Sequence, residues 1–192
     1  MNPKNSGIIY VAVLGAVVAT FCDKMHVLTG ALYYPQPFIN DQAWWVFPGF
    51  TVAFTAMGIV YLQMVKFLPA NISRVFSTSP TGLKSMSESM LMFALFYILS
   101  GFGNESPLFL NLLFYGTFLI RLTLTQDKIF ILILSVILGI GGTLGEGILS
   151  WFGLVYYTKP VIFLVPTWLG GLYFHGAFAL RDSMRLFVYR NK

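Results

Sequence analysis

Long apolar runs separated by short polar stretches are the dominant pattern of this 192-residue chain. A helix that crosses the ~30 Å apolar core of a bilayer needs about 20 mostly apolar residues. Six runs come close to this length, so the pattern predicts an all-α, polytopic membrane protein with a single domain of six transmembrane helices. The predicted spans are approximately residues 7–22, 42–65, 86–103, 107–124, 129–157 and 160–181.

Polar residues mark the ends of several predicted spans. The sequence Asp23-Lys24-Met25-His26 closes the first run, and a connection with two prolines follows it. Asp41 is placed to cap the second helix, because a side-chain oxygen at that position accepts from free backbone amides. Ser85 and Glu88 have the spacing of a capping box, which predicts that the third helix begins there.

The positions of lysine and arginine predict the orientation of the chain. When the connections alternate between the two sides of the membrane, ten basic residues fall on one side and two on the other. Basic residues are enriched on the cytoplasmic side, so both termini are predicted to be cytoplasmic. The two on the opposite side are Lys24 and Lys159, and the ten are Lys4, Lys66, Arg74, Lys84, Arg121, Lys128, Arg181, Arg185, Arg190 and Lys192.

Composition agrees with a membrane protein. Hydrophobic residues make up 57% of the chain and charged residues only 10%, which is too apolar for an ordinary soluble domain. The net charge of +5 does not indicate a nucleic-acid partner, because the basic residues punctuate apolar runs and do not gather with polar neighbours. With one cysteine and two histidines, the sequence predicts no disulfide, no metal site and no cofactor.

Two ionisable residues in the last two spans, Glu146 and His175, are the leading candidates for function. They lie 14 residues before and 15 residues after Pro160, so a turn near Pro160 would place them at a similar depth. An ionisable group at such depth marks a function or a paired structural contact. Three roles are open: binding the head of an amphipathic ligand, holding two helices together, or acid/base catalysis.

Three other positions have more than one interpretation. The indole N–H of Trp168 needs a partner if it lies inside the bundle. Asp127 precedes the fifth span and either solvates or caps the turn, or contacts a partner's helix. Asp23 and His26 fit a solvated face better than a metal site, because two ligands make only part of a coordination shell.

Two segments resemble the Insig family of membrane proteins. The first is Ala43-Trp44-Trp45-Val46-Phe47-Pro48-Gly49, followed by Gly58 and Tyr61. The second runs in register through Gly153, Tyr157, Thr158, Pro160, Trp168, Leu169, Phe174, Gly176 and Arg185. Asp127-Lys128 falls, within one residue, where the family has an acid–arginine turn. The compact form of the chain resembles the prokaryotic relatives.

The resemblance implies six transmembrane helices, no enzymatic activity, a cavity for a sterol or another lipid, and helix contacts with membrane partners or further copies of the chain. By this resemblance Asp127 is a partner-contact residue. Glu146 stands next to the position where the family has an amide facing the ligand. The residues expected to contact lipid are Trp45, Glu146, Tyr157, Trp168 and His175. The compartment is the inner membrane of a bacterium or, in a eukaryote, the endoplasmic reticulum.

The function expected from the sequence is therefore non-enzymatic binding of an amphipathic lipid, coupled to a membrane partner. Two alternatives remain. A small lipid enzyme would use Glu146 and His175 as acid and base. A small transporter would be expected to have a matching pair of broken helices, but only the fifth span is interrupted by glycines.

Overall fold

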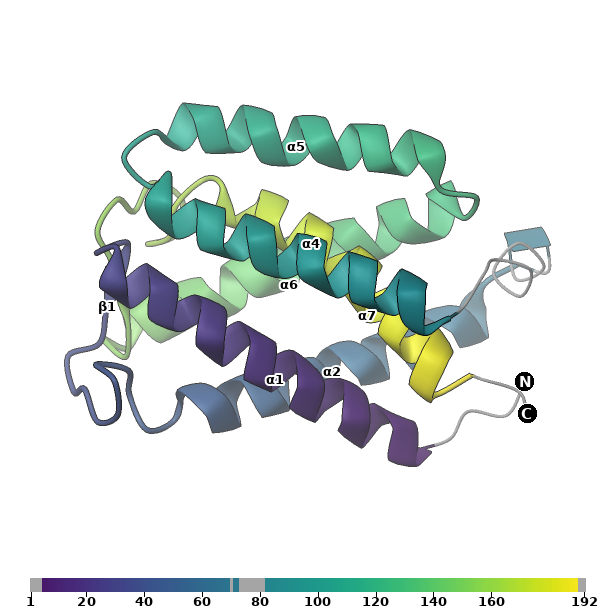
Figure 1. The fold of residues 1–192 in the computed structure, drawn as a ribbon, viewed down its shortest axis with the longest axis horizontal. Coiled ribbons are helices and arrows are strands. Elements are labelled where there is room, and N and C mark those ends of the chain that lie inside the picture. The colour runs from purple at the N-terminus through teal and green to yellow at the C-terminus, as the bar shows by residue number, and fades with distance from the viewer. Residues whose placement is uncertain (1–4, 70, 73–81, 190–192) are drawn as a thin grey trace.

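The computed structural model describes residues 5–69, 71–72 and 82–189 and has six long helices in this part of the chain (Figure 1). Two short strands lie between helices. The elements are α1 (Asn5–Leu28), β1 (Leu32–Tyr33), α2 (Val46–Phe67), α4 (Leu83–Phe102), α5 (Pro107–Leu124), α6 (Lys128–Trp151), β2 (Tyr156–Tyr157) and α7 (Leu169–Phe187).

Helix α7 is the centre of the bundle. It packs against α1, α4, α5 and α6, and Figure 1 shows it between α5 on one side and α1 and α2 on the other. Most of its residues are buried, including Arg181, Asp182 and Arg185. The other five long helices are apolar enough to cross a membrane. Because its neighbours cover α7, this helix can carry charges that an outer helix could not.

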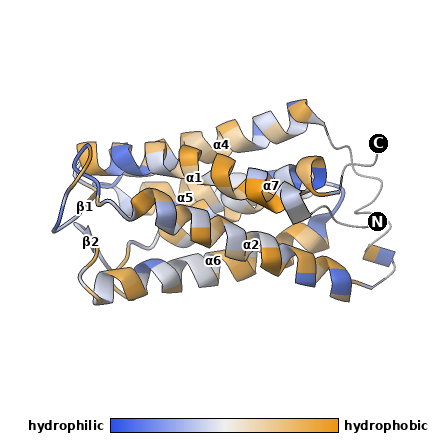
Figure 2. Ribbon diagram, turned by 90° about the horizontal axis from the view of Figure 1, so that it is seen from below, coloured by the Kyte–Doolittle hydropathy of each residue, from blue (hydrophilic) through white to orange (hydrophobic). Residues whose placement is uncertain are grey.

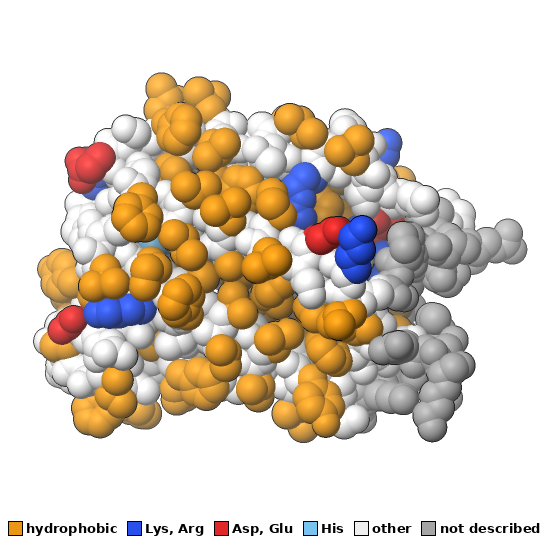
Figure 3. Space-filling model, viewed as in Figure 1, with side chains coloured by type: hydrophobic (Ala, Val, Ile, Leu, Met, Phe, Trp, Pro, Cys, Tyr) orange, Lys and Arg blue, Asp and Glu red, His pale blue; other side chains and the backbone are white. Residues whose placement is uncertain are grey.

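The outer surface of the bundle is apolar. Large hydrophobic side chains on α4 and α5, such as Leu91, Leu108 and Leu112, are about 70% exposed (69%, 72% and 68%). Figure 3 shows such side chains across one face, with charged groups toward its two ends, and Figure 2 shows the same distribution on the ribbon. Surface of this kind is favourable in lipid and not in water. The chain is an integral membrane protein.

Several helix ends differ from the predicted ones. Helix α1 continues to Leu28, so the predicted end at residue 22 is wrong. Helix α6 ends at Trp151 and not near residue 157, and α7 begins at Leu169 and not near residue 160. The chain from 152 to 168 is apolar but forms a hairpin, which an apolar run alone does not distinguish from helix.

The predicted caps are also wrong. Trp45 occupies the N-cap position of α2, and Asp41 instead pairs with Lys24 at 3.1 Å. Gly82 occupies the N-cap position of α4, so the predicted capping box of Ser85 and Glu88 lies inside the helix. Four of the basic residues counted for orientation, Lys4, Arg74, Arg190 and Lys192, lie outside the described part of the chain.

The chain contains an internal repeat of a helix–hairpin–helix unit. The first copy is α1, a hairpin and α2, and the second is α6, a hairpin and α7. Adding 123 to a residue number of the first copy gives the equivalent residue of the second. Six residue types are then identical between residues 23–50 and 146–173, at Gly30/Gly153, Tyr33/Tyr156, Tyr34/Tyr157, Pro37/Pro160, Ile39/Ile162 and Trp45/Trp168.

Backbone geometry repeats with the same offset. Gly30 and Gly153 both have φ near +70° (70° and 68°), a value that glycine adopts without strain. Each hairpin closes through an isolated bridge, Ile39 to Gln42 in the first copy and Ile162 to Val165 in the second. The left-handed residues between them are also equivalent, Asn40 and Asp41 in one copy and Phe163 and Leu164 in the other.

The two copies meet at their hairpins. Strands β1 and β2 are antiparallel, and the equivalent residues Tyr33 and Tyr156 pair with each other. Their rings stack with centroids 5.3 Å apart. Both hairpins therefore lie at one end of the bundle, so the repeat is parallel and not inverted.

The predicted orientation can be tested with single cysteines at the two ends of the bundle. Gln36, in the first hairpin, and Lys128, at the start of α6, are both exposed. If the termini are cytoplasmic, a membrane-impermeant maleimide will label Gln36→Cys in spheroplasts but will label Lys128→Cys only after lysis. The wild type is the control, because Cys22 is fully buried and should not react. The opposite labelling pattern would reverse the orientation.

Candidate lipid-binding cavity

A cavity of about 390 Å³ lies between α1, α2, α4, α6 and α7. Its volume is in the range of small-molecule binding sites. One wall is a stripe of α2 with helical spacing, and most of the lining is apolar. The lining residues are Ala19, Asp23, Tyr34, Trp44, Trp45, Val46, Pro48, Gly49, Phe50, Val52, Ala53, Phe54, Met57, Phe93, Tyr97, Glu146, Leu149, Leu169, Leu172 and Tyr173.

The cavity reaches the outer surface of the bundle along α2. Two of its lining residues, Trp44 and Val52, are 69% and 70% exposed. A ligand could therefore have its tail in the surrounding lipid and its head inside the bundle.

Asp23 provides one acid of the cavity. Its Oδ2 atom accepts hydrogen bonds from the Tyr34 hydroxyl and from Nε2 of Gln42, each at 2.8 Å. The side chain is 2% exposed, and the helix continues past it to Leu28. The expectation that Asp23 and His26 form a solvated face is wrong. His26 is also buried, with Nε2 3.0 Å from the Tyr97 carbonyl oxygen.

Glu146 provides the second acid, at the position equivalent to Asp23. Its Oε2 accepts from the Tyr157 hydroxyl at 3.1 Å, and its Oε1 from the Tyr173 hydroxyl at 3.3 Å. Tyr157 is the equivalent of Tyr34, so each copy of the repeat supplies one acid and the tyrosine that donates to it. Both acids face the same cavity.

The two equivalent tyrosines lie in the hairpins and are held as hydrogen-bond donors. Burial raises the pKa of the Tyr34 hydroxyl well above the ordinary value of tyrosine, and the nearby Asp23 carboxyl raises it further. Burial likewise raises the pKa of Tyr157, followed by the effect of Glu146. Both hydroxyls therefore remain protonated and can donate to the acids at any physiological pH.

The polar lining of the cavity consists of two acids and three tyrosine hydroxyls, those of Tyr34, Tyr97 and Tyr173. No lysine, arginine or histidine is among its lining residues. The described residues contain no group of three or more histidine, cysteine, aspartate or glutamate side chains that could hold a metal ion. The site can accept hydrogen bonds from a ligand and has no basic side chain to bind an anion.

His175 does not join Glu146 in this cavity, contrary to the prediction. Its Nε2 donates to the Phe114 carbonyl oxygen at 3.0 Å, and its Nδ1 accepts from Arg121 at 2.9 Å. The ring is fully buried and stacks on Phe96.

The prediction failed because depth does not determine the face of a helix. Glu146 lies five residues before the end of α6 and His175 six after the start of α7, so their depths are similar. However, two residues correspond to about 200° around a helix, so His175 and the cavity-lining Tyr173 point to opposite sides. The acid and base that the alternative of a lipid enzyme requires are therefore not brought together.

The other predicted lipid contacts are divided in the same way. Trp45 lines the cavity, and Tyr157 reaches it through its hydrogen bond to Glu146. Trp168 is fully buried and is not among the lining residues, but its indole N–H donates to Oδ1 of Asn104 at 3.3 Å. Trp168 thus fixes the start of α7, and its expected hydrogen-bond partner is present.

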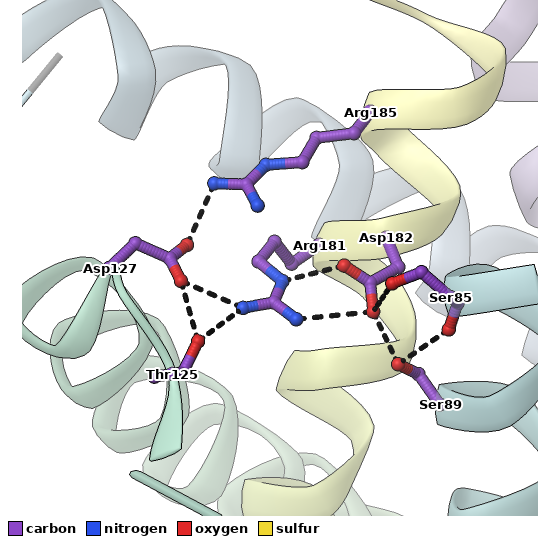
Figure 4. A network of polar contacts seen from close by, with 7 residues as sticks. All are labelled: Ser85, Ser89, Thr125, Asp127, Arg181, Asp182 and Arg185. Atoms are coloured by element: carbon purple, nitrogen blue, oxygen red, sulfur yellow. Dashed lines mark hydrogen bonds and ion pairs between the residues drawn. The ribbon is translucent and has the colours of Figure 1, made fainter. Parts of the chain in front are cut away.

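Asp127 lies just before α6, beside the last turns of α7. It is part of a buried network of charges (Figure 4). Its two carboxylate oxygens pair with Arg181 and Arg185, each at 2.8 Å. Arg181 also pairs with Asp182 at 2.7 Å, and Asp182 accepts from Ser85 and Ser89 of α4. The network joins the start of α6 and α4 to the last turns of α7.

This environment differs from the one expected for Asp127. The residue is 3% exposed, and both oxygens are bound within the chain. Its carboxylate is therefore not presented on the surface, and a partner contact at this turn would have to use neighbouring residues such as Gln126 and Lys128, which are exposed. The role of Asp127 in partner binding stays a prediction.

Sequence reasoning missed Asp23 as a cavity residue. The signal that could have found it is the repeat, because Asp23 and Glu146 precede matching Tyr-Tyr pairs at the same distance. Only six of the 28 residues between 23 and 50 are identical to their equivalents, and two of these are glycine and proline. The match becomes clear when the hairpin geometry is added.

Comparison with known proteins supports the Insig resemblance. No protein-family model matches the chain, and no curated protein matches it. Two crystal structures of MvINS, a mycobacterial Insig homolog from Mycobacterium vanbaalenii, have a similar fold. A cross-linked trimer of a MvINS variant aligns with a TM-score of 0.75 and 21% identity, covering 96% of this chain and 94% of that one.

The second MvINS structure gives nearly the same result. It aligns with a TM-score of 0.74 and 19% identity, covering 97% of this chain and 96% of that one. The Insig resemblance is therefore confirmed at the level of the fold over nearly the whole chain. At this identity the likeness does not transfer a ligand.

The buried charge network predicts a large loss of stability when Asp127 is neutralised. Asp127→Asn removes the carboxylate that pairs with Arg181 and Arg185, and breaking a buried ion pair costs about 3–5 kcal/mol. We expect the free energy of unfolding, measured with sodium dodecyl sulfate in mixed micelles, to fall by about 3 kcal/mol. Glu88→Gln is the control, because its ion pair with Lys84 is exposed and should contribute less than about 1 kcal/mol. Equal effects of the two changes would contradict the interpretation.

Proposed function

We propose that this protein with the Insig fold is a non-enzymatic membrane protein that binds a sterol or another amphipathic lipid, such as a diacylglycerol-like molecule, in the cavity beside α2. The observation that carries the proposal is an apolar cavity with two acids at its polar part and an opening toward lipid. The head of the ligand would donate to Asp23 and Glu146, and its tail would lie along the α2 wall.

Binding fits this site better than catalysis. Glu146 is hydrogen-bonded to two tyrosines, and the base that a lipid enzyme would need, His175, is bound to Arg121 and a backbone carbonyl on the other side of α7. A catalytic site needs a nucleophile or base aligned with a second group that stabilises the developing charge. In the described lining the hydroxyls of Tyr34 and Tyr173 already donate to the two acids, an arrangement that suits ligand binding.

A regulatory role would use α7 as the link between the ligand and a partner. Leu169, Leu172 and Tyr173 of α7 line the cavity, while Arg181 and Arg185 of the same helix hold Asp127. Suppose that α7 has two arrangements in the bundle and the ligand binds one of them more tightly. The ligand would then shift the equilibrium toward that arrangement by its difference in affinity, and the turn at Asp127 would change with it. The partner would be another membrane protein or a second copy of this chain. MvINS was crystallised as a cross-linked trimer, which favours a homo-oligomer.

Transport is a second candidate, favoured by the repeat. Parallel repeats related by an axis along the membrane normal occur in several transporters, with the substrate site at the interface of the two copies. Here Asp23 and Glu146 come from different copies and line one cavity. Uptake of the bound lipid or its head group into proteoliposomes would favour transport over regulation.

Filling the cavity should remove bound lipid. Ala53 lies on the α2 wall, and Ala53→Phe adds a ring to the cavity. Overpacking costs about 1–3 kcal/mol, and a misfit of about 1.4 kcal/mol already corresponds to a roughly tenfold loss of affinity. We expect about tenfold less lipid to co-purify after native extraction, measured by mass spectrometry, with the lipid chemically unchanged in the wild type.

Ile59→Phe is the matched control for this experiment. Ile59 is on the same helix, is 49% exposed and does not line the cavity. If both variants retain the lipid of the wild type, the cavity is not its binding site. If the wild type converts an added lipid to a product, the enzymatic alternative replaces the proposal.

A further inference from the structure

The polar part of the cavity is unusual for a lipid site because all of its ionisable side chains are acids or phenols. Asp23 and Glu146 each accept two hydrogen bonds, from Tyr34 and Gln42 and from Tyr157 and Tyr173. In all four bonds the carboxyl oxygen is the acceptor, which is the arrangement that stabilises a carboxylate. Two acids, one from each copy of the repeat, therefore line the space that the head of a ligand would occupy.

None of the lining residues supplies a compensating positive charge. The basic side chains nearest in sequence to the two acids are paired elsewhere, since Lys24 pairs with Asp41 in the first hairpin and Lys159 pairs with Glu105. Buried charges in membrane proteins are normally paired. The missing partner can come from the ligand.

The rest of the lining is suited to a cation. Trp44, Trp45, Phe50, Phe93 and Tyr97 line the same space. Aromatic faces attract ammonium groups, and the attraction strengthens when water is excluded. The same surroundings are unfavourable for a phosphate or carboxylate head, because no lining residue can offset its charge.

We propose that the head of the bound amphiphile is a primary ammonium, so that the cavity takes a long-chain amine. This inference rests on the proposed lipid-binding function and specifies its ligand. A primary ammonium has one positive charge and three N–H donors, so it can pair with a carboxylate and still donate to a second acceptor of the lining. A hydroxyl head can donate to one of the acids but has no charge to pair with a carboxylate, and an anionic head has a charge of the same sign as a carboxylate.

The test compares ligands that share a twelve-carbon tail and differ only in the head. Dodecylamine, dodecanol and dodecanoate are titrated into the purified protein in neutral glycoside micelles, with tryptophan fluorescence as the readout because Trp44 and Trp45 line the cavity. We expect dodecylamine to bind at least roughly tenfold more tightly than dodecanol, and dodecanoate to bind more weakly than either.

Isosteric variants then identify the source of the preference. Glu146→Gln and Asp23→Asn each remove one negative charge with little change of shape, and each should lower the amine-to-alcohol affinity ratio several-fold. Glu105→Gln is the control, because this acid is exposed and pairs with Lys159 in the hairpin region, so the ratio should not change. The partitioning of a given ligand into micelles is the same for the wild type and each variant, so it cancels when their affinity ratios are compared.

Each outcome decides the proposal. Equal binding of dodecylamine and dodecanol by the wild type would overturn the ammonium head but leave lipid binding intact. A preference unchanged in both isosteric variants would also overturn it. Binding of either ligand that is no weaker in Ala53→Phe would remove the cavity itself as a lipid site. The wild-type comparison needs no variant, so it remains decisive even if a variant fails to fold, provided that each ligand's affinity is expressed against its measured concentration in the micelles.

Discussion

The constraint that shapes this protein is the absence of water inside its bundle. A polar group at that depth is costly unless another group of the chain, or a ligand, satisfies it. Helix α7 shows how the fold meets this constraint, because it carries Arg181, Asp182 and Arg185 yet is buried among its neighbours. The two arginines are neutralised by Asp127 and Asp182, which ties the central helix to α6 and α4. In the cavity, by contrast, two acids are met by neutral hydrogen-bond donors of the chain.

The repeat explains why two acids, Asp23 and Glu146, line the same cavity. A helix–hairpin–helix unit with an acid near the end of its first helix, and a tyrosine after the turn, occurs twice and meets its copy at Tyr33 and Tyr156. The second donor to each acid differs, Gln42 in one copy and Tyr173 in the other. The acid–tyrosine pair thus persists although most surrounding residues have changed. Two copies arranged in parallel place two acids in one cavity.

The fold could be predicted from the sequence to a large extent, because lipid requires long apolar runs that composition shows directly. The run at 107–124 has the same bounds as α5, since Pro107 and the polar residues after Leu124 break the pattern. The second hairpin could not be found in this way, because Val161 to Leu164 are as apolar as a helix but are exposed in a loop. Nor could the faces be assigned: the spacing around Pro160 predicts a similar depth for Glu146 and His175, but Glu146 of α6 lines the cavity and His175 of α7 points away from it. The buried network around Asp127 pairs residues more than 50 positions apart, which no local pattern reveals.

These features make α7 the element through which a ligand could act at a distance. Its first turns line the cavity, and its last turns hold the charges at the opposite end of the bundle. A helix packed on all sides cannot shift gradually, because each neighbour fits it at close-packed density. It can only move between arrangements in which both ends are satisfied. A head group that pairs with Asp23 and Glu146 would favour one arrangement of α7 through its own binding energy. The ion pairs of Arg181 and Arg185 with Asp127, at the C-terminal end of α7, would change with that arrangement.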